Sequence, residues 1–398
     1  MRLGRPRLQG RDWAAIAVIV VLLAIGVTFV RSASYRSGPM GEGYYTASPA
    51  KQVVWAAFGA VVFAGVLFLN YRHLLEHAYV LYGLGLVLLV AVLFVGVTSD
   101  VIHARRWLQV GPFRLQPSEL MKILVILALA RYLMYSEQHR RFGGLAVPFL
   151  MVLVPMVLIA KEPDLGTALV LLPVAFALLY VAAARSRHLL LIVLLMATAA
   201  PVVWLHMRPY QKERVLAFLA QEDRNVREEY QLRQAKAAIG AGRLWGRGLG
   251  QGTQNRLNFL PAANNDFIFA VICEEWGFVG ANAVLALYFL LLLLCLRTAE
   301  DTHHPGGRLI VVGVVAMVGS QVIVNTAMAA GQLPIVGLTL PLISYGGSSL
   351  LSSLIGLALV VNVSTYRQVA LAGDDFDPEA EARRATAPMP EESFMRPS

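Results

Sequence analysis

One acidic residue stands at the boundary between a polar loop and a hydrophobic segment. Asp266 follows a Gly-rich stretch that ends in PAANN, and the residues after it are mostly apolar as far as Leu296. A carboxylate at such a boundary stays hydrated, whereas one deeper in lipid is costly and rare. Because a carboxylate within hydrogen-bond reach of a hydroxyl can remove its proton, Asp266 is the first candidate for a catalytic base.

A second group of charges opens a predicted helix further upstream. Gln116-Pro117-Ser118 is typical of a helix start, and Glu119 and Lys122 follow three residues apart, on one face of that helix. The two are either a local ion pair beside a capping turn or part of a functional site. An ammonium one turn into a hydrophobic helix needs an acceptor, and Glu119 can supply it.

Two further polar motifs allow a structural or a functional interpretation. The segment KEPD separates two hydrophobic runs, and its Asp164 can cap the helix that follows or bind a ligand. Arg106 stands beside Trp107, a combination that favours the membrane interface but can also clamp a phosphate group.

The C-terminal half adds polar residues within and between hydrophobic runs. Glu274 and Glu275 lie about two to three turns into the run after Asp266, so one must face the protein interior. The stretch 332–349 is a Pro- and Gly-broken hairpin that contains Ser348, a candidate binding residue. Irregular backbone at membrane depth needs protein or a water-filled cavity around it.

Four other residues inside these runs favour structural roles. Gln321 and Asn325 are four residues apart on one helical face, where they more often bond neighbouring helices than a ligand. Cys273 and Cys295 lie in one run, so we expect packing residues and neither a disulfide nor a metal framework.

The composition places all these residues in a membrane protein. Hydrophobic residues make up 57% of the 398 and charged residues only 15%, which excludes an ordinary soluble domain. Runs long enough to cross a bilayer as helices predict an all-α polytopic fold with ten transmembrane spans. The predicted spans are Trp13–Val30, Gln52–Leu69, Ala78–Val97, Leu120–Met134, Ala146–Ala160, Leu165–Ala183, His188–Leu205, Phe267–Leu296, Leu309–Ala330 and Gly347–Val363.

Basic residues recur after every second span, as at Arg72, Arg140, Arg185 and Arg297, and this pattern places both termini in the cytoplasm. Residues 1–371 then form a single ten-helix membrane domain, with a long extracytoplasmic loop over residues 206–265, between spans seven and eight. The tail, residues 372–398, is polar and poor in apolar residues, so we expect it to be disordered and cytoplasmic.

The long loop carries many cations, among them Arg214. They form either a solvated surface or a site for an anion such as the phosphate of a lipid head group. Residues 228–240 have helical composition and end in Gly, which predicts an interfacial helix. The Gly-rich remainder, AGRLWGRGLGQGT, lacks the spacing of a P-loop, so no nucleotide site is implied. We also expect no organic cofactor and no nucleic-acid partner.

Together these stretches resemble the SEDS family, the shape, elongation, division and sporulation proteins. The resemblance covers about residues 13–366 and rests on RRWLQVGPFRLQPSELMKI, KEPDLGT, YQKERV, GTQNRLNFLPAANNDFIFAVICEEWGFVG and GQLPIVGLTLPLISYGGSSLL, in that order. GTQNRLNFLP and LPIVG resemble the RodA branch, which we prefer, while GLTLPLISYGGSS is closer to FtsW. Asn264-Asn265 and Trp276 depart from the residues many members carry there.

The resemblance implies a ten-helix fold with an outward-facing cavity and a catalytic aspartate at Asp266, with functional residues at Glu119 and Lys122. It implies that the substrate is lipid II, the undecaprenyl-diphosphate-linked disaccharide pentapeptide, and that the partner is a class B penicillin-binding protein. It also suggests a divalent cation, Mg²⁺ or Mn²⁺, although no ligand cluster in the sequence identifies one. The protein would reside in the bacterial plasma membrane with its active site on the extracytoplasmic face.

The expected reaction is transfer of the growing glycan chain to the 4-hydroxyl of lipid II. Asp266 would act as base, orient the hydroxyl or hold a cation, and the sequence leaves these roles open. Lys122, Arg106 and Arg214 are candidates for stabilising the departing diphosphate, and Asp164, Glu119, Glu275 and Ser348 complete the expected binding residues. The alternatives are a lipid II flippase, whose polar site would lie near the bilayer midplane, and a non-catalytic scaffold.

Overall fold

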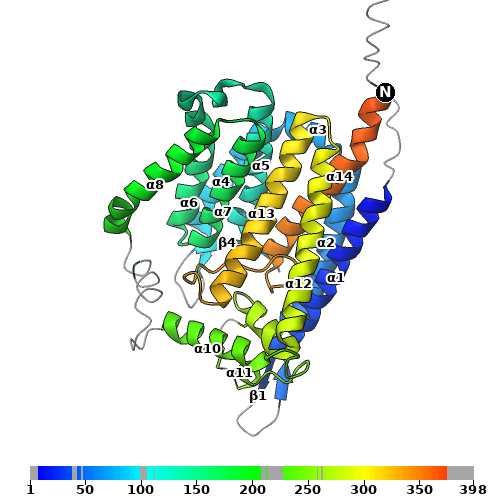
Figure 1. The fold of residues 1–398 in the computed structure, drawn as a ribbon, viewed down its shortest axis with the longest axis vertical. Helices are drawn as coiled ribbons and strands as arrows, with labels where there is room; N and C mark the ends of the chain where they lie inside the picture. The colour runs from blue at the N-terminus through cyan, green and yellow to red at the C-terminus, as the bar shows by residue number, and fades with distance from the viewer. Residues whose placement is uncertain are drawn as a thin grey trace, which may run out of the picture.

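The structure is a computed structural model of the whole chain, and it describes residues 8–37, 43–45, 48–98, 105–111, 113–207, 212, 227–257, 259–260 and 263–373. Arg214 and residues 374–398 of the predicted disordered tail lie outside the described residues, whereas residues 372 and 373 are the helical end of α14. Long helices lie side by side in one bundle, and the start of α1 and the end of α14 are at the same end (Figure 1). Their bounds are α1 Gly10–Ala33, α2 Ser48–Phe68, α4 Ala78–Val95, α5 Pro117–Tyr135, α6 Ala146–Lys161, α7 Leu165–Val181, α8 Ser186–His206, α12 Ile268–Glu300, α13 Pro305–Ala329 and α14 Gly347–Gly373.

Shorter elements gather at the two ends of the bundle. Near the lower end of α12 in Figure 1 lie α10, α11 and β1, whereas α3 lies at the opposite end. The loop predicted to contain an interfacial helix contains the helix α10, which begins one residue earlier and ends two residues later than predicted, and its place at a membrane interface stays a prediction. The bounds are α3 Tyr71–Glu76, α10 Arg227–Gly242 and α11 Thr253–Arg256, with 3-10 turns at Gln138–Arg140 and Phe142–Leu145.

The wholly helical prediction needs a correction in two loops. β1 (Tyr35–Ser37) pairs antiparallel with β2 (Gly43–Tyr45), and β3 (Val97–Thr98), β4 (Arg105–Val110) and β5 (Phe113–Leu115) form an antiparallel sheet. Strands β4 and β5 lie between the predicted spans Ala78–Val97 and Leu120–Met134, in residues that no predicted span includes. The order of this sheet, β3-β4-β5, places Arg106 on the central strand.

Helices α13 and α14 form the inside of the bundle. α13 packs against α5, α7, α12 and α14, and α14 also packs against α2. In the hydrophobic window of α14, 89% of the residues are buried, against 11% in α2, so α2 lies on the outside. Gly313 permits a close approach between helices, because an added Cβ would lie 2.6 Å from a methyl group of Ile126 on α5.

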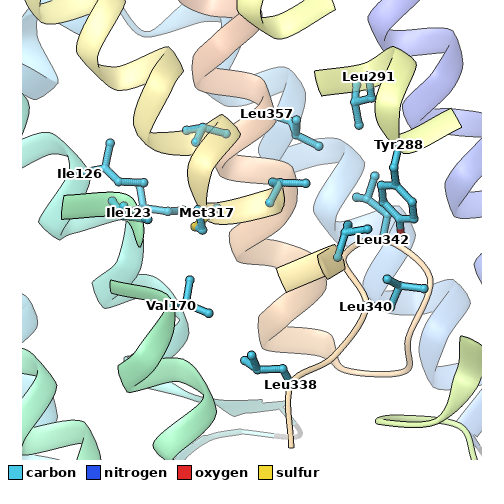
Figure 2. Close-up of a cluster of buried hydrophobic side chains, with 14 of the residues drawn as sticks. Ile123, Ile126, Val170, Tyr288, Leu291, Met317, Leu338, Leu340, Leu342 and Leu357 are labelled. Carbon is cyan, nitrogen blue, oxygen red and sulfur yellow. The ribbon is translucent and has the colours of Figure 1, made fainter. Parts of the chain in front are cut away.

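The centre of the bundle is an apolar cluster that joins five helices to the loop between α13 and α14. Figure 2 shows side chains from α5, α7, α12, α13 and α14 directed towards one another, with Leu338, Leu340 and Leu342 of the loop among them. All three leucines are at most 2% exposed. The hydrophobic effect of burying them fixes the irregular loop inside the bundle, as backbone without helix at this depth requires.

Seven helices of the described residues are long and apolar enough to cross a membrane. They are α1, α2, α4, α6 with the 3-10 turn before it, α12, α13 and α14. The described apolar parts of α7 and α8 are shorter, and α5 carries three charges, at Glu119, Lys122 and Arg131. The chain is therefore a multi-pass, mainly helical membrane protein, and the count of ten spans stays a prediction.

One predicted span is in fact two helical segments. Gly277 has non-helical backbone angles (φ 67°, ψ −164°), which break α12. Every residue from Ile268 to Glu275 is buried, so the first segment is surrounded by protein rather than lipid. The second segment, residues 278–300, is roughly 33 Å long at 1.5 Å per residue and can cross the hydrocarbon layer alone.

Candidate functional site

The backbone at Asp266 and the two residues before it is held by hydrogen bonds to three consecutive carbonyls. Tyr345 N donates to Asn264 O (2.9 Å), and Ser344 Oγ donates to Asn265 O (2.6 Å). Asn325 Nδ2 donates to the carbonyl of Asp266 itself (2.9 Å). Because the backbone is fixed at each residue, the direction in which the Asp266 side chain leaves it is fixed as well.

The Asp266 carboxylate lies against an exposed turn. A Cβ added to Gly337 would lie 3.6 Å from Asp266 Oδ2, and Gly337 is exposed while Asp266 is half-buried. Gly337 has a φ of 73°, a conformation that residues with a side chain rarely adopt. The aspartate therefore stands at an accessible place whose neighbour has no side chain to cover it.

The start of α7 meets the same turn from the other side. A Cβ on Gly166 would lie 2.6 Å from Val336 O and 2.8 Å from Leu338 Cγ, so only glycine permits this approach. Asp164 caps α7 as predicted, with Oδ1 accepting from Thr167 N (3.3 Å). The turn at residues 336–338 therefore lies between the capping aspartate and Asp266.

Asp164 also joins the start of α7 to the start of α5 through side-chain hydrogen bonds. Its Oδ2 accepts from Gln116 Nε2 (2.7 Å) and Ser118 Oγ (3.3 Å), just before and within the first turn of α5. Ser348, at the start of α14, accepts from Gln116 N (2.9 Å) and donates to Arg114 O (3.2 Å). Asp164 and Ser348 thus belong to one network that fixes the ends of three helices.

The Arg106 side chain binds the turn between α6 and α7, so it is not a free cation on an open surface. Its Nε donates to Glu162 O (2.9 Å), and Nη2 donates to Pro163 O. Glu162 is 1% exposed, and neither of its carboxylate oxygens has a hydrogen-bond partner among the described residues. Burial, and then the nearby Asp164 carboxylate, raise the pKa of Glu162 to about 8, against the lowering effect of the Arg106 charge.

Glu119 and Lys122 form the predicted ion pair. Lys122 Nζ lies 2.8 Å from Glu119 Oε2, and the same oxygen accepts from Ser352 Oγ of α14 (2.9 Å). The Lys122 side chain is fully buried. The pair therefore joins α5 to α14 inside the protein, and Lys122 presents no charge to the surface.

Glu274 and Glu275 both face the protein interior, where they bind the long loop. Glu274 Oε1 accepts from Gln254 N and Thr253 Oγ1 (both 3.1 Å). Glu275 Oε1 accepts from Ser32 Oγ of α1 (2.5 Å). The sequence predicted that one of the two must be buried, and both are.

The main-chain groups freed at the Gly277 break pair with the loop. Phe278 N and Val279 N donate to Arg243 O (2.8 Å) and Leu244 O (3.1 Å). Glu274 O and Glu275 O accept from Arg247 N (3.0 Å) and Gly248 N (2.9 Å). The loop thus pairs all four of these main-chain groups, which would otherwise be buried without a hydrogen bond.

The structure gathers Asp266, Asp164, Arg106, Glu119, Lys122 and Ser348 at one end of the bundle, linked by the contacts above. Sequence reasoning used Gln116 only as part of a helix start, and it missed Ser352 and the hydrogen bond from Asn325 to Asp266. The Asn325 amide, predicted to bond a neighbouring helix, also donates to Leu338 O (2.6 Å). Its position four residues after Gln321 was the available signal.

The described residues contain no ready-made cage for a divalent cation. Among the described residues, no three His, Cys, Asp or Glu side chains gather in a group that could hold a metal ion. Mg²⁺ usually takes one or two carboxylates together with waters and substrate phosphates, so Asp266 could hold such an ion jointly with a bound diphosphate. The cation that the family resemblance suggests stays a prediction.

Comparison with known proteins decides the family. The model of the FtsW/RodA/SpoVE family, described as cell cycle protein, matches residues 12–369. The chain belongs to this family. It is 34% identical to the peptidoglycan glycosyltransferase MrdB of Escherichia coli K12, over 90% of this chain and 94% of the relative. It is 32% identical to stage V sporulation protein E of Bacillus subtilis, over 89% and 97%.

Solved structures of the FtsW/RodA/SpoVE family share the fold. A chain of a peptidoglycan synthase complex that coordinates polymerisation and crosslinking is similar with a TM-score of 0.76 and 35% identity, over 89% of this chain and 98% of that one. Rod shape determining protein RodA of Thermus thermophilus is similar with a TM-score of 0.66 and 32% identity, over 89% and 97%. The predicted resemblance is thereby confirmed.

Proposed function

We propose that this chain is a peptidoglycan glycosyltransferase that polymerises glycan strands in cell elongation or division. Its relatives from Escherichia coli and Geobacter metallireducens are named as a peptidoglycan glycosyltransferase and a probable one, at 34% and 33% identity. The observation that carries the proposal is the clamp on Asn264, Asn265 and Asp266. It presents one carboxylate at an accessible turn and keeps the backbone there from reorienting.

The proposed reaction needs one base and one leaving group. The 4-hydroxyl of lipid II attacks the anomeric carbon of the growing chain, and the bond from that carbon to the diphosphate oxygen breaks. Undecaprenyl diphosphate leaves with the bonding electrons, and the hydroxyl proton passes to the Asp266 carboxylate. General-base catalysis of this kind typically contributes about two to four orders of magnitude.

The charged residues near Asp266 act chiefly by holding the surrounding elements in place. Lys122 is paired and buried, and Arg106 donates to main-chain carbonyls, so in this arrangement both hold the bundle end together. We assign them positioning roles for the turn at 336–338 and the start of α5. Stabilisation of the departing diphosphate is a role we propose for the cations of the long loop, Arg214 included.

We further propose that the Asp266 end of the bundle faces the extracytoplasmic side and that both termini are cytoplasmic. Support comes from the basic residues Arg140 and Arg185, which lie on connections at the other end, as cytoplasmic loops favour. We also propose a class B penicillin-binding protein as partner, because the similar solved complex joins polymerisation to crosslinking.

The deciding experiment incubates the purified full-length protein with labelled lipid II in detergent, where sidedness is lost. Asp266→Asn should reduce glycan synthesis at least about 100-fold, because the base is lost while the shape is kept. Glu300→Gln, which neutralises an exposed carboxylate at the far end of α12, the helix that follows Asp266, is the control and should leave the rate unchanged.

Two outcomes would reject the proposal. Glycan synthesis by Asp266→Asn at the wild-type rate would remove the assigned base. Wild-type protein that makes no glycan in detergent, but moves lipid II across vesicle membranes, would establish the flippase alternative.

A further inference from the structure

An exposed turn on the long loop combines apolar and cationic side chains. Leu244 and Trp245 are 61% and 78% exposed, and Arg243 and Arg247 beside them are also exposed. Residues 241–247 enclose a surface hollow of about 510 Å³. A tryptophan this exposed is unusual on a surface that faces only water, because its large apolar ring loses the stabilisation of burial.

The turn is rigidly attached to the start of the membrane-crossing part of α12. The hydrogen bonds from Phe278 N and Val279 N place Arg243 and Leu244 directly beside the break at Gly277. Phe278 and Val279 are themselves 64% and 45% exposed, and they begin the outer face of that helix segment. The exposed apolar surface of the turn is therefore continuous with a surface that lies against lipid.

The composition of the turn matches the boundary between hydrocarbon and head groups. Tryptophan is enriched at that depth because its ring is apolar while its N–H bonds to water or head groups. Arginine beside it can donate to lipid phosphate, and a cation near an anionic surface gains from it electrostatically. Arg243 has an exposed side chain, whereas Arg247 also donates to Thr253 Oγ1 (2.7 Å).

We propose that residues 243–247 form a membrane anchor that enters the head-group layer of the bilayer, with Leu244 and Trp245 in its apolar edge and Arg243 on phospholipid phosphate. The occupant is bulk phospholipid, preferentially anionic, and the proposal does not depend on the catalytic role of Asp266. Since Glu274 and Glu275 bind the same loop, the anchor sets the position of the short helix that follows Asp266 relative to the membrane surface.

The first test measures fluorescence quenching of the full-length protein in nanodiscs whose lipids carry bromine near the head group or near the chain end. We expect shallow bromines to quench more than deep ones, and Trp245→Phe to remove most of that difference. Trp13→Phe, at an exposed tryptophan near the start of α1, is the matched control and should leave the Trp245 component in place. Quenching of Trp245 by aqueous iodide but not by brominated lipid would overturn the anchor and indicate water or a protein partner instead.

The second test measures retention of phosphatidylglycerol relative to phosphatidylcholine by native mass spectrometry. Arg243→Gln should lower the preference for the anionic lipid about fivefold, and Arg243→Lys should keep most of it. Inorganic phosphate at equal concentration should not compete, because the apolar contacts are missing. Competition by phosphate alone, or an unchanged preference in Arg243→Gln, would overturn the assignment to phospholipid.

Discussion

At the scale of single residues, the buried pair Glu119–Lys122 is the most sensitive feature. A pair taken out of water is weakly stabilising overall, but removal of one partner leaves a buried charge that costs roughly 3–5 kcal/mol. We expect Glu119→Lys and Lys122→Glu each to lower the melting temperature in detergent and to abolish most glycan synthesis.

The exchanged double variant Glu119→Lys/Lys122→Glu is the control for this pair. It restores opposite charges and should recover part of both the melting temperature and the activity, although the hydrogen bond from Ser352 is lost. If both single reversals left activity and stability unchanged, the pair would have no role in holding α5 to α14.

The raised pKa of Glu162 predicts that the stability of the folded protein depends on pH. This pKa is raised from 4.5 to about 8, so the folded protein binds this proton more tightly than the unfolded chain. The folded state therefore loses stability as the pH rises from 4.5 to about 8, and the loss is complete above that range. Glu162→Gln stays neutral and should melt at a higher temperature than the wild type above pH 8, with little difference near pH 4.5.

Melting curves over this pH range, in one detergent, test the Glu162 prediction. Glu137→Gln, at an exposed glutamate beyond the end of α5, should leave the difference between low and high pH as in the wild type. A wild-type profile that rose towards pH 8 would show that the Glu162 carboxyl is not held in its neutral form.

Local sequence patterns predicted the interactions of residues whose partners lie close to them in the sequence. Glu119 and Lys122 are one helical turn apart, and Asp164 caps the helix it precedes, so spacing alone indicated both interactions. The burial of Glu162 and the bond from Asn325 to Asp266 depend on packing between distant segments. A glutamate beside a proline has the composition of a loop, and nothing in its neighbours indicates that the fold encloses it.

At the scale of elements, the break in α12 depends on one glycine. Gly277 has a φ of 67°, and a Cβ there would lie 2.5 Å from Leu244 O. Gly277→Ala should therefore destabilise the protein by more than the roughly 1–3 kcal/mol of backbone strain alone, because the loop must also move. Gly83→Ala in α4, where an added Cβ meets nothing within 4 Å, is the control and should be neutral or mildly stabilising.

Thermal unfolding of both glycine variants, together with proteolysis of the long loop, measures this effect. We expect the loop to be cut faster in Gly277→Ala, since its main-chain bonds to α12 are lost. A melting temperature and a cleavage rate equal to those of the wild type would mean that the break is not held by the loop.

Sequence reasoning placed a single span after Asp266 because the run is hydrophobic and long enough to cross a bilayer. The break at Gly277 could be recognised only in the structure. The carbonyls that pair with its main-chain groups, those of Arg243 and Leu244, belong to a loop well upstream. The same packing explains how Glu274 and Glu275 are accommodated. They lie in a segment enclosed by protein, so they never enter lipid.

At the scale of the whole molecule, hydropathy predicted the helices but not which of them lie inside the bundle and which lie on its outside. The windows of α2 and α14 have nearly equal mean hydropathy, 1.7 and 1.6, yet α14 is central and α2 is peripheral. Lipid and protein interior are both apolar, so composition cannot separate the two surroundings. Serines along α14, such as Ser352 with its bond to Glu119, were the available indication of an inner helix.

The orientation of the bundle is the prediction that joins these scales, because a polymerase of extracytoplasmic glycan needs Asp266 on the outer side. Gln251 is exposed in the loop at the Asp266 end, and Gln138 is exposed in the connection from α5 to α6. Cys273 and Cys295 are buried, so the native thiols should react little with a maleimide that cannot cross membranes. In spheroplasts, Gln251→Cys should be labelled at once and Gln138→Cys only after the membrane is permeabilised. The reverse pattern would place Asp266 on the cytoplasmic side, where lipid II that has already crossed the membrane cannot reach it, and the proposed polymerase would be rejected at the level of its topology.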